Sequence, residues 1–483
     1  MNLPQIIQGG MGVAISNWRL AKTVSEKGQL GVVSGTALDS VHARTLQDGD
    51  CGGFLRDAYK KFPIAEMARR VLDRWFSPDG KPEGAPYKPV PVFNTNPATC
   101  LTELTAMSAF GEVTLAKGGT DAPVGINLLD KIKFPQLATL YGAMLAGVDY
   151  VLMGAGIPRH VPGMLDKLSE GRPATMKVDV EGGGEVEIGF DPEAFLGKPA
   201  PRLRRPKFLA IVSSATLALS LARKSSGRVD GFIVESSVAG GHNAPPRGPL
   251  QLDAGGQPVY GERDKAELGK IAALGLPFWL AGGRASAEGL ASAKAAGAAG
   301  IQVGTAFACC EESGMAAVLR RKLIAAVRAG GVRVFTDPLA SPTGFPFKVA
   351  QVDGTISDKK NYAARQRVCD LGYLRSAYRK ADGGVGFRCA SEPVDDYVAK
   401  GGAASSTGGR VCLCNSLLAS TGLGQIRKNK LVEDMISTAG DTLNDIVRFL
   451  KDGVDHYSAA DVIDSLLELI TPAEPPALAA AGS

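Results

Sequence analysis

The chain has 483 residues, of which 45% are hydrophobic and 21% are charged, and this balance excludes an intrinsically disordered protein. The 54 Lys and Arg residues and 49 Asp and Glu residues give a net charge of only +5, and the basic residues are dispersed apart from the run 202–207. Aromatic residues make up only 6% of the chain, so no nucleic-acid partner is expected. No apolar run is long enough to span a membrane and no signal-peptide pattern opens the chain, so we expect a cytoplasmic protein without membrane contact.

The first two thirds of the sequence predict alternating strands and helices. Eight short, almost wholly apolar runs are typical of parallel strands that are covered on both faces. These runs are 5–8, 31–34, 124–128, 150–153, 208–212, 232–235, 278–281 and 301–304. Helical patterns at 18–27, 135–146, 215–224 and 287–296 follow four of them. Eight such units favour a (β/α)₈ barrel over an open doubly wound sheet.

Two insertions interrupt this alternation, at 37–123 and at 171–206. The first predicts helices around 54–76 and 100–110, and the second predicts a β-hairpin whose two alternating segments flank 181–184. Both insertions follow strands, so we expect them on the catalytic rim of the barrel, where they could form a lid.

The barrel is predicted to occupy residues 1–350, and residues 351–483 to form a C-terminal extension. Helices are expected at 313–329, 443–450 and 458–469, with a frayed tail at 472–483. Four cysteines fall close together in the extension, namely Cys369, Cys389, Cys412 and Cys414. Four thiolates of this kind could bind zinc or an iron–sulfur cluster, although four unrelated reduced cysteines remain the alternative.

Glycine motifs close the last two predicted barrel strands, with Gly282-Gly283 after one and Gln302-Val303-Gly304-Thr305 at the other. Glycines there expose backbone N–H groups to an anion, and this is the usual phosphate site of such barrels. The alternative is that these glycines only make tight turns between strand and helix.

A second motif, Gly240-Gly241-His242, follows the sixth predicted strand. The two glycines allow a flat ligand to approach, and the histidine is well placed as a general base or hydrogen-bond donor. His160 could line the same mouth, whereas His42 and His456 are expected at the surface.

Two further strand ends carry residues suited to a ring system. Gly10-Met11 follows the first strand, where a thioether could pack on an aromatic ring or simply enter the core. Asn127 ends the third strand, where it could bind a heterocycle edge or a ribityl chain, or cap the next helix.

Taken in order, these motifs resemble those of the nitronate monooxygenase family, formerly called 2-nitropropane dioxygenases. The resemblance covers roughly residues 3–350, including Ser341-Pro342-Thr343-Gly344. Members of the family are FMN-dependent (β/α)₈ enzymes that use dioxygen to oxidise alkyl nitronates to a carbonyl compound and nitrite. Relatives with the same fold reduce enoyl thioesters or quinones, so the fold alone does not determine the chemistry.

The resemblance also implies a role for each motif. Gly282, Gly283, Gly304 and Thr305 would hold the FMN phosphate, and Asn127, Gly240 and Gly241 would contact the isoalloxazine or ribityl part. Gly10 and Met11 would lie against the ring, and Glu235 and Gln302 belong to the same cofactor-binding motifs. His242 would be the catalytic base or orienting group near flavin N5.

Departures from the family pattern bear on the substrate. Glu235 stands where the family commonly has Gln, and a carboxylate beside reduced flavin is unfavourable unless it is protonated or paired. The stiff loop 243–248 replaces a short small-residue turn and should reshape the mouth. Arg159 and Arg247 could meet an anionic substrate.

Three functions follow from these observations. The first is FMN-dependent oxidation of alkyl nitronates or similar carbanion-like small molecules with dioxygen. The second is an NAD(P)H-dependent FMN reductase that acts on an enoyl thioester or quinone, and the third is a flavin-binding scaffold subunit. Homo-oligomerisation is left open.

Overall fold

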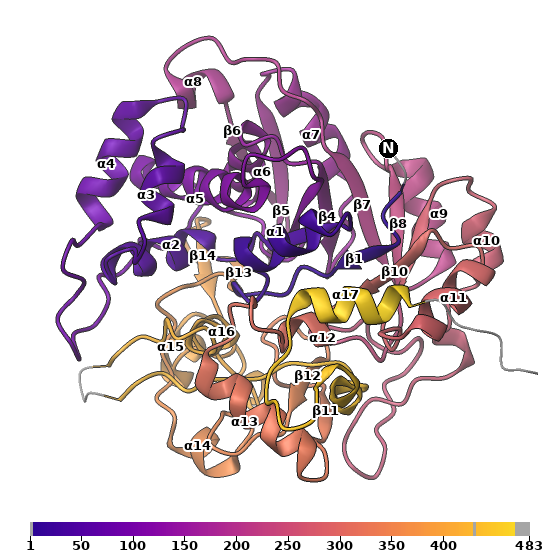
Figure 1. Cartoon of the computed structure of the whole chain (residues 1–483). Helices are drawn as coiled ribbons and strands as arrows, with labels where there is room; N and C mark the ends of the chain where they lie inside the picture. Colours follow the sequence, from indigo (N-terminus) through magenta and orange to yellow (C-terminus); the bar gives the residue numbers. More distant parts are fainter. Residues whose placement is uncertain (1–2, 428–430, 469–483) are drawn as a thin grey trace, which may run out of the picture.

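Eight parallel strands form a nearly closed barrel in the computed structural model, which describes residues 3–427 and 431–468 (Figure 1). The strands are β1 (Ile6–Gln8), β2 (Gly31–Ser34), β3 (Val124–Leu129), β4 (Tyr150–Gly154), β7 (Lys207–Val212), β8 (Gly231–Glu235), β9 (Phe278–Ala281) and β10 (Gly300–Val303). Their order is β1-β10-β9-β8-β7-β4-β3-β2, and the Gln8 N–H donates to the Leu30 carbonyl (2.9 Å) where β1 meets β2. The predicted (β/α)₈ barrel is therefore confirmed.

Helices surround the barrel because each strand is apolar on both faces and must be covered from outside as well as inside. They are α1 (Trp18–Glu26), α5 (Thr99–Lys117), α6 (Gln136–Leu145), α7 (Val161–Ser169), α9 (Ala215–Lys224), α10 (Leu268–Ala272), α11 (Ala287–Ala295), α12 (Thr305–Ala308) and α13 (Ala317–Arg328). Side chains of Asn17, Ser214 and Ser286 cap α1, α9 and α11. The predicted helix 313–329 is shorter than expected, since the Ser313 hydroxyl instead bonds the Ala308 carbonyl in a turn before α13.

The insertion after β2 is helical, with α2 (Leu38–Gln47), α3 (Phe54–Tyr59) and α4 (Ala65–Trp75) preceding α5. Helix α5 is longer than the predicted segment 100–110 and packs against α1 and α6. It is the helix of the barrel that connects β2 to β3. Part of the first insertion is therefore barrel wall rather than rim.

His42 lies inside this insertion and not at the surface, which corrects the sequence expectation. It is 1% exposed, its Nδ1 lies 2.9 Å from the Tyr59 hydroxyl, and its Nε2 lies 2.9 Å from Glu112 Oε2. The backbone N–H of Trp18 donates to the other Glu112 oxygen (2.7 Å). The histidine thus links α2, α3 and α5 around a buried carboxyl group, a role that its apolar neighbours in sequence did not indicate.

Replacing His42 with alanine is expected to lower the free energy of unfolding by about 2–3 kcal/mol, because Tyr59 and Glu112 would lose a buried partner. Urea unfolding measures this difference. The matched control is His456→Ala, since that side chain is 50% exposed. Equal stabilities of the two variants would contradict the structural role of His42.

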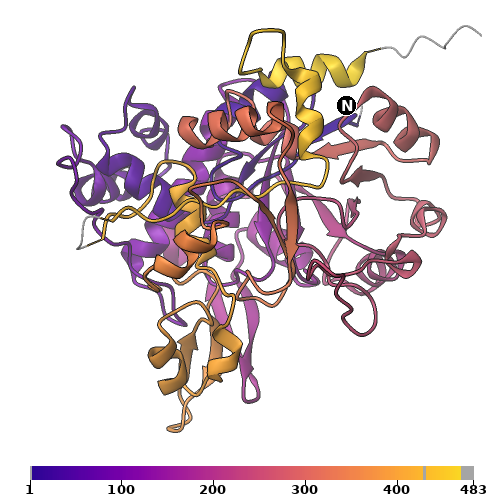
Figure 2. The same ribbon diagram turned by 90° about the horizontal axis from the view of Figure 1, so that it is seen from below.

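The second insertion is the predicted hairpin, β5 (Ala174–Glu181) and β6 (Glu185–Phe190), followed by α8 (Pro192–Leu196). It does not stand alone. β13 (Ser376–Arg379) pairs with β5 in parallel and with β14 (Val385–Arg388) in antiparallel, which gives a four-stranded sheet. Figure 2 shows the magenta hairpin and the orange β13–β14 ribbon projecting together from the barrel.

The remaining elements come from the C-terminal part of the chain, apart from one short turn. They are η1 (Glu262–Asp264), β11 (Val334–Asp337), β12 (Phe347–Ala350), α14 (Lys359–Ala364), α15 (Val394–Ala399), η2 (Ala404–Thr407), α16 (Leu413–Ala419), η3 (Leu443–Phe449) and α17 (Ala459–Leu467). The predicted helix 443–450 is the 3₁₀ segment η3, and α17 packs on α1 and α11 (Figure 1). The predicted frayed tail 472–483 lies outside the described residues.

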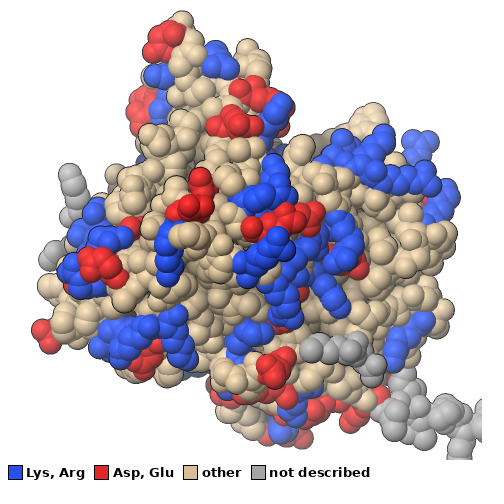
Figure 3. Space-filling view, turned by 90° about the horizontal axis from the view of Figure 1, so that it is seen from above, with Lys and Arg blue, Asp and Glu red and all other residues tan. Residues whose placement is uncertain are grey.

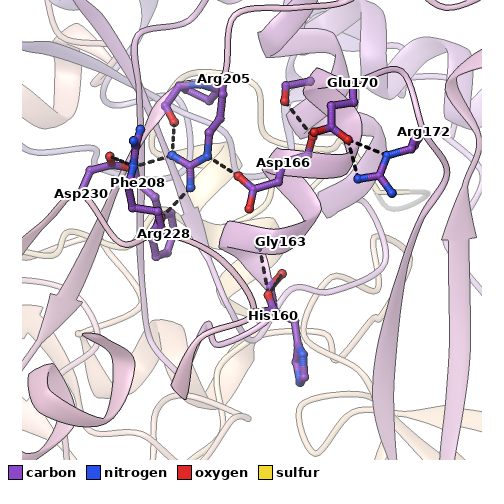
Figure 4. Close-up of polar contacts among 12 residues, drawn as sticks. His160, Gly163, Asp166, Glu170, Arg172, Arg205, Phe208, Arg228 and Asp230 are labelled. Carbon is purple, nitrogen blue, oxygen red and sulfur yellow. Dashed lines mark hydrogen bonds and ion pairs between the residues drawn. The ribbon is translucent and has the colours of Figure 1, made fainter. Parts of the chain in front are cut away.

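The basic run 202–207 makes structural ion pairs at the start of β7. Arg205 Nε contacts Asp166 Oδ1 (2.5 Å), and its Nη1 contacts Asp230 Oδ2 (2.7 Å) (Figure 4). Arg204 pairs with Asp149. Lys and Arg side chains also gather on the face seen in Figure 3, but Asp and Glu side chains are interspersed among them. Within the described part of the chain, no helix is long and apolar enough to cross a membrane.

Candidate active site

A cavity of about 1080 Å³ opens at the carboxyl ends of the barrel strands. It collects most of the residues that the sequence predicted for the site: Gly10, Met11, Asn127, His160, Glu235, Gly240, Gly241, His242, Arg247, Gly282, Gly283, Gln302, Gly304 and Thr305. Parallel strands bring these motifs to one edge although they are far apart in sequence. Strands of the β5–β13 sheet also line the cavity, so the second insertion does reach the barrel mouth.

The turn after β1 is held by side chains beneath it. The Gln8 amide donates to the Ser16 hydroxyl (2.8 Å), and that hydroxyl accepts the Met11 N–H (2.8 Å). A Cβ at Gly10 would lie 2.1 Å from the Asn127 Cβ. The absence of a side chain at this glycine lets the turn lie directly against the end of β3, which brings the Met11 loop and Asn127 to the same wall.

Gly282 and Gly283 follow β9 with φ angles of 92° and 65°, a backbone conformation that strains any other residue. A Cβ at Gly282 would lie 2.3 Å from the Ser236 hydroxyl. The β9 turn therefore packs against the loop after β8, and Gly304 and Thr305 directly follow the neighbouring strand β10. Such a turn can present N–H groups to an anion.

The side-chain oxygen of Gln302 is a candidate contact for a ligand. The Oε1 atom is buried and has no hydrogen-bond partner among the described residues. A buried carbonyl oxygen without a donor costs roughly 1–3 kcal/mol. Because Gln302 lines the cavity, a ligand N–H could supply the missing donor.

His242 lies on the cavity wall with its ring edge-on to Phe347 of β12, at a centroid distance of 4.8 Å. Its Nε2 lies 2.7 Å from the Ser341 hydroxyl, which belongs to the Ser341–Gly344 motif. Burial lowers the pKa of His242 to about 4, so the imidazole is neutral at physiological pH. A neutral ring held by one nitrogen can orient a ligand with the other.

Glu235 ends β8 and faces the same cavity. No described residue pairs with its carboxyl group, and burial raises its pKa to about 8. The side chain is partly exposed only because it borders the cavity. The carboxyl is therefore mainly protonated at neutral pH, which meets the condition that the sequence set for a glutamate beside a reduced flavin.

The predicted anion-binding arginines are placed differently from each other. Arg247 borders the cavity, and its backbone N–H donates to Asp264 (2.8 Å). Arg159 does not border the cavity, and its Nη2 donates to the Ser220 hydroxyl (3.2 Å). His160 is exposed at the rim, and it is its carbonyl that accepts from Ser226 (3.0 Å) (Figure 4). Arg159 is thus separated from the site that it was expected to serve.

The four cysteines of the extension come together as two pairs. A hydrogen bond from Cys369 lowers the pKa of Cys389 to about 7, and a hydrogen bond from Cys414 lowers that of Cys412. Within residues 3–427 and 431–468, no three Cys, His, Asp or Glu side chains are arranged to hold a metal ion. The zinc or iron–sulfur hypothesis therefore has no support in the geometry.

All residues of the segment 437–442 except Asp441 also line the cavity, although the sequence had assigned them to an extension outside the barrel. We call this segment the C-terminal loop. The Gly440 N–H donates to the Thr305 hydroxyl (2.9 Å), and the Gly241 N–H donates to the Thr438 hydroxyl (3.0 Å). Only a Ser-Thr-Ala-Gly sequence marks this loop, and such small polar residues are common in ordinary turns, so the sequence held no sufficient signal.

Part of the chain matches a known protein family. Residues 197–334, which contain Glu235, the Gly240–His242 motif and both glycine turns, match the model of the family described as nitronate monooxygenase. This match confirms the resemblance over those residues and agrees with the predicted class of enzyme, an oxidoreductase. No curated protein matches the chain.

The solved structures that are similar to this chain include three enzymes. FabK from Thermotoga maritima is 17% identical, with 96% of this chain and 91% of that chain covered and a TM-score of 0.47. Nitroalkane oxidase from Streptomyces ansochromogenes is 15% identical, with 96% and 94% covered and a TM-score of 0.45. The enoyl reductase domain of MlnA from Bacillus amyloliquefaciens is 11% identical, with the same coverage and a TM-score of 0.45.

Proposed function

We propose that this barrel, matched to the nitronate monooxygenase family over residues 197–334, binds FMN and oxidises alkyl nitronates or similar carbanion-like small molecules with dioxygen. The observation that carries the proposal is that a neutral His242 and a protonated Glu235 line one cavity together with the two glycine turns. The bound flavin would supply the electron acceptor.

The residues present fit FMN. Gly282, Gly283, Gly304 and Thr305 offer N–H and hydroxyl groups to a phosphate. The unpaired Gln302 Oε1 suits a ring N–H, and Met11 and Gly10 leave room for a flat ring. Asn127, Gly240 and Gly241 would contact the rest of the cofactor.

The neutral protonation state of His242 favours a substrate that is already ionised. A neutral imidazole whose pKa is lowered to about 4 is a weak base, so it is poorly suited to remove a proton from a neutral nitroalkane. A nitronate needs no such step. We infer that His242 orients the nitronate and that Arg247 on the rim attracts its charge, whereas a protonated Glu235 avoids repelling it.

A second candidate is favoured by the size of the cavity. The volume of about 1080 Å³ lies at the upper end of the range of small-molecule sites. A cavity of this size suits an enoyl thioester or a quinone, which NAD(P)H-reduced FMN would reduce. In a scaffold subunit, by contrast, flavin would bind without turnover.

The test is an anaerobic titration of the purified protein that follows the visible flavin band, with ethyl nitronate in one series and NADH or NADPH in another. We expect bleaching by the nitronate and, on admission of air, release of nitrite. Neutral nitroethane should react more slowly at the same pH. Bleaching by the nicotinamide alone would replace the proposal with the reductase, and bleaching by neither donor would favour the scaffold.

A further inference from the structure

The C-terminal loop closes one end of the cavity, next to the glycine turn after β9. A Cβ built at Gly283 would lie 3.7 Å from the Thr442 Cγ2, so the two residues are direct neighbours. Thr442, Gly440, Gly283 and Thr305 all line the cavity. The barrel side of the predicted phosphate site therefore faces a wall that comes from outside the matched segment 197–334.

We propose that this wall is part of the phosphate subsite: Thr442 contacts the phosphate, and Gly440 positions Thr305 to do so. The inference rests on the proposed binding of FMN. It assigns a cofactor-binding role to a loop that lies more than a hundred residues beyond the glycine turns in sequence.

The hydroxyl groups support this assignment. Thr305 Oγ1 accepts the Gly440 N–H (2.9 Å), which leaves its own proton free to be donated to an anion. No described residue forms a hydrogen bond with the Thr442 hydroxyl, although it borders the cavity. Two threonines with hydroxyl protons available to an anion thus line this end of the cavity.

The loop is fixed in place by the chain segment it covers. The Asp441 N–H donates to the Val238 carbonyl (3.0 Å), and the Thr438 hydroxyl accepts the Gly241 N–H (3.0 Å). A Cβ at Gly440 would lie 2.8 Å from the Val238 carbonyl oxygen. Any side chain at this position would therefore push the loop away from the barrel.

The charges of the loop are compatible with an anion. Asp441 would repel a phosphate if it were unpaired, but the Lys348 Nζ lies 2.7 Å from its Oδ1 and is itself 1% exposed. Asp445 does line the cavity, and its Oδ2 lies 3.6 Å from Arg448 Nη2. Each of these two carboxylates thus has a cationic partner.

The test compares FMN with riboflavin, which lacks only the phosphate. Dissociation constants are measured by fluorescence titration of each flavin into flavin-free, full-length protein, for the wild type and for Thr442→Val and Gly440→Ala. The matched controls are Thr421→Val and Gly408→Ala, because both residues lie in the same extension away from the cavity, and a Cβ at Gly408 meets only an ordinary contact at 3.8 Å.

We expect Thr442→Val and Gly440→Ala to raise the Kd of FMN about tenfold, or about 1.4 kcal/mol, while the Kd of riboflavin changes less than twofold. Equal weakening of both flavins would make the loop a general structural element and overturn the inference. Unchanged FMN affinity of the two variants would also overturn the inference, as would a wild type that binds riboflavin as tightly as FMN. In both cases the proposal that the protein binds a flavin would stand. A wild type that binds neither flavin would overturn both proposals.

Discussion

Replacing His242 with alanine is expected to lower kcat with the reactive donor by about 10²–10⁴-fold while FMN remains bound. The imidazole borders the cavity but does not belong to the glycine turns that would hold the phosphate, so turnover and cofactor retention should separate. Stopped-flow reduction of the flavin band measures the first quantity, and the flavin content of the purified variant measures the second. A variant with full turnover would remove the catalytic role of His242.

Ser341→Ala provides the graded control for this prediction. It removes the hydroxyl that lies 2.7 Å from His242 Nε2 but leaves the ring packed against Phe347. We expect a decrease of about tenfold, because the ring would be less well oriented. A decrease as large as that of His242→Ala would mean that the serine itself acts on the substrate.

The pH dependence should carry the signature of a buried, neutral histidine. The pKa of His242 is about 4 in the folded protein, against an ordinary value of 6.5. Between these values the unfolded chain binds a proton that the folded protein does not, so His242 costs stability as pH falls from 6.5 towards 4. The His242→Ala variant should show a weaker loss of stability over this range in chemical unfolding experiments.

Glu235→Gln is expected to raise the free energy of unfolding, by on the order of 2 kcal/mol at pH 8.5 and by much less at pH 5. The folded pKa of about 8 lies above the ordinary value of 4.5. In that window the folded protein holds a proton that the unfolded chain has released, so stability falls as pH rises from 4.5 to 8. An uncharged amide of the same shape removes this cost.

The control for this prediction is Glu187→Gln on the exposed face of the hairpin, which should leave the pH dependence unchanged. Chemical unfolding at pH 5, 7 and 8.5 gives the three free energies for each protein. If Glu235→Gln is no more stable than the wild type at pH 8.5, the carboxyl is ionised in the fold. The protonated state used in the proposed function would then be wrong.

The sequence predicted best those strands and turns whose structure depends on residues close by in the chain. All eight barrel strands were predicted to within one residue at each end, because short apolar runs such as Val124–Leu129 are typical of covered parallel strands. The glycine turns and His242 follow from the same rule, since carboxyl ends of parallel strands share one rim.

The errors have a common physical cause, which is contact between segments distant in sequence. His42 was expected at the surface, but Glu112 and Tyr59 bury it. Arg159 lies beside the predicted mouth in sequence, yet its guanidinium contacts Ser220 outside the cavity. No local pattern encodes these pairings, because each depends on how two helices or loops pack.

The sequence by itself thus determined the barrel and the set of motifs at the rim, since alternation of strands and helices and glycine-rich strand ends are local properties. Only the tertiary structure decided the pKa of Glu235 and of His242, because burial sets both. It also decided that β13 extends the hairpin and that the C-terminal loop reaches Thr305, since both contacts join residues more than a hundred positions apart.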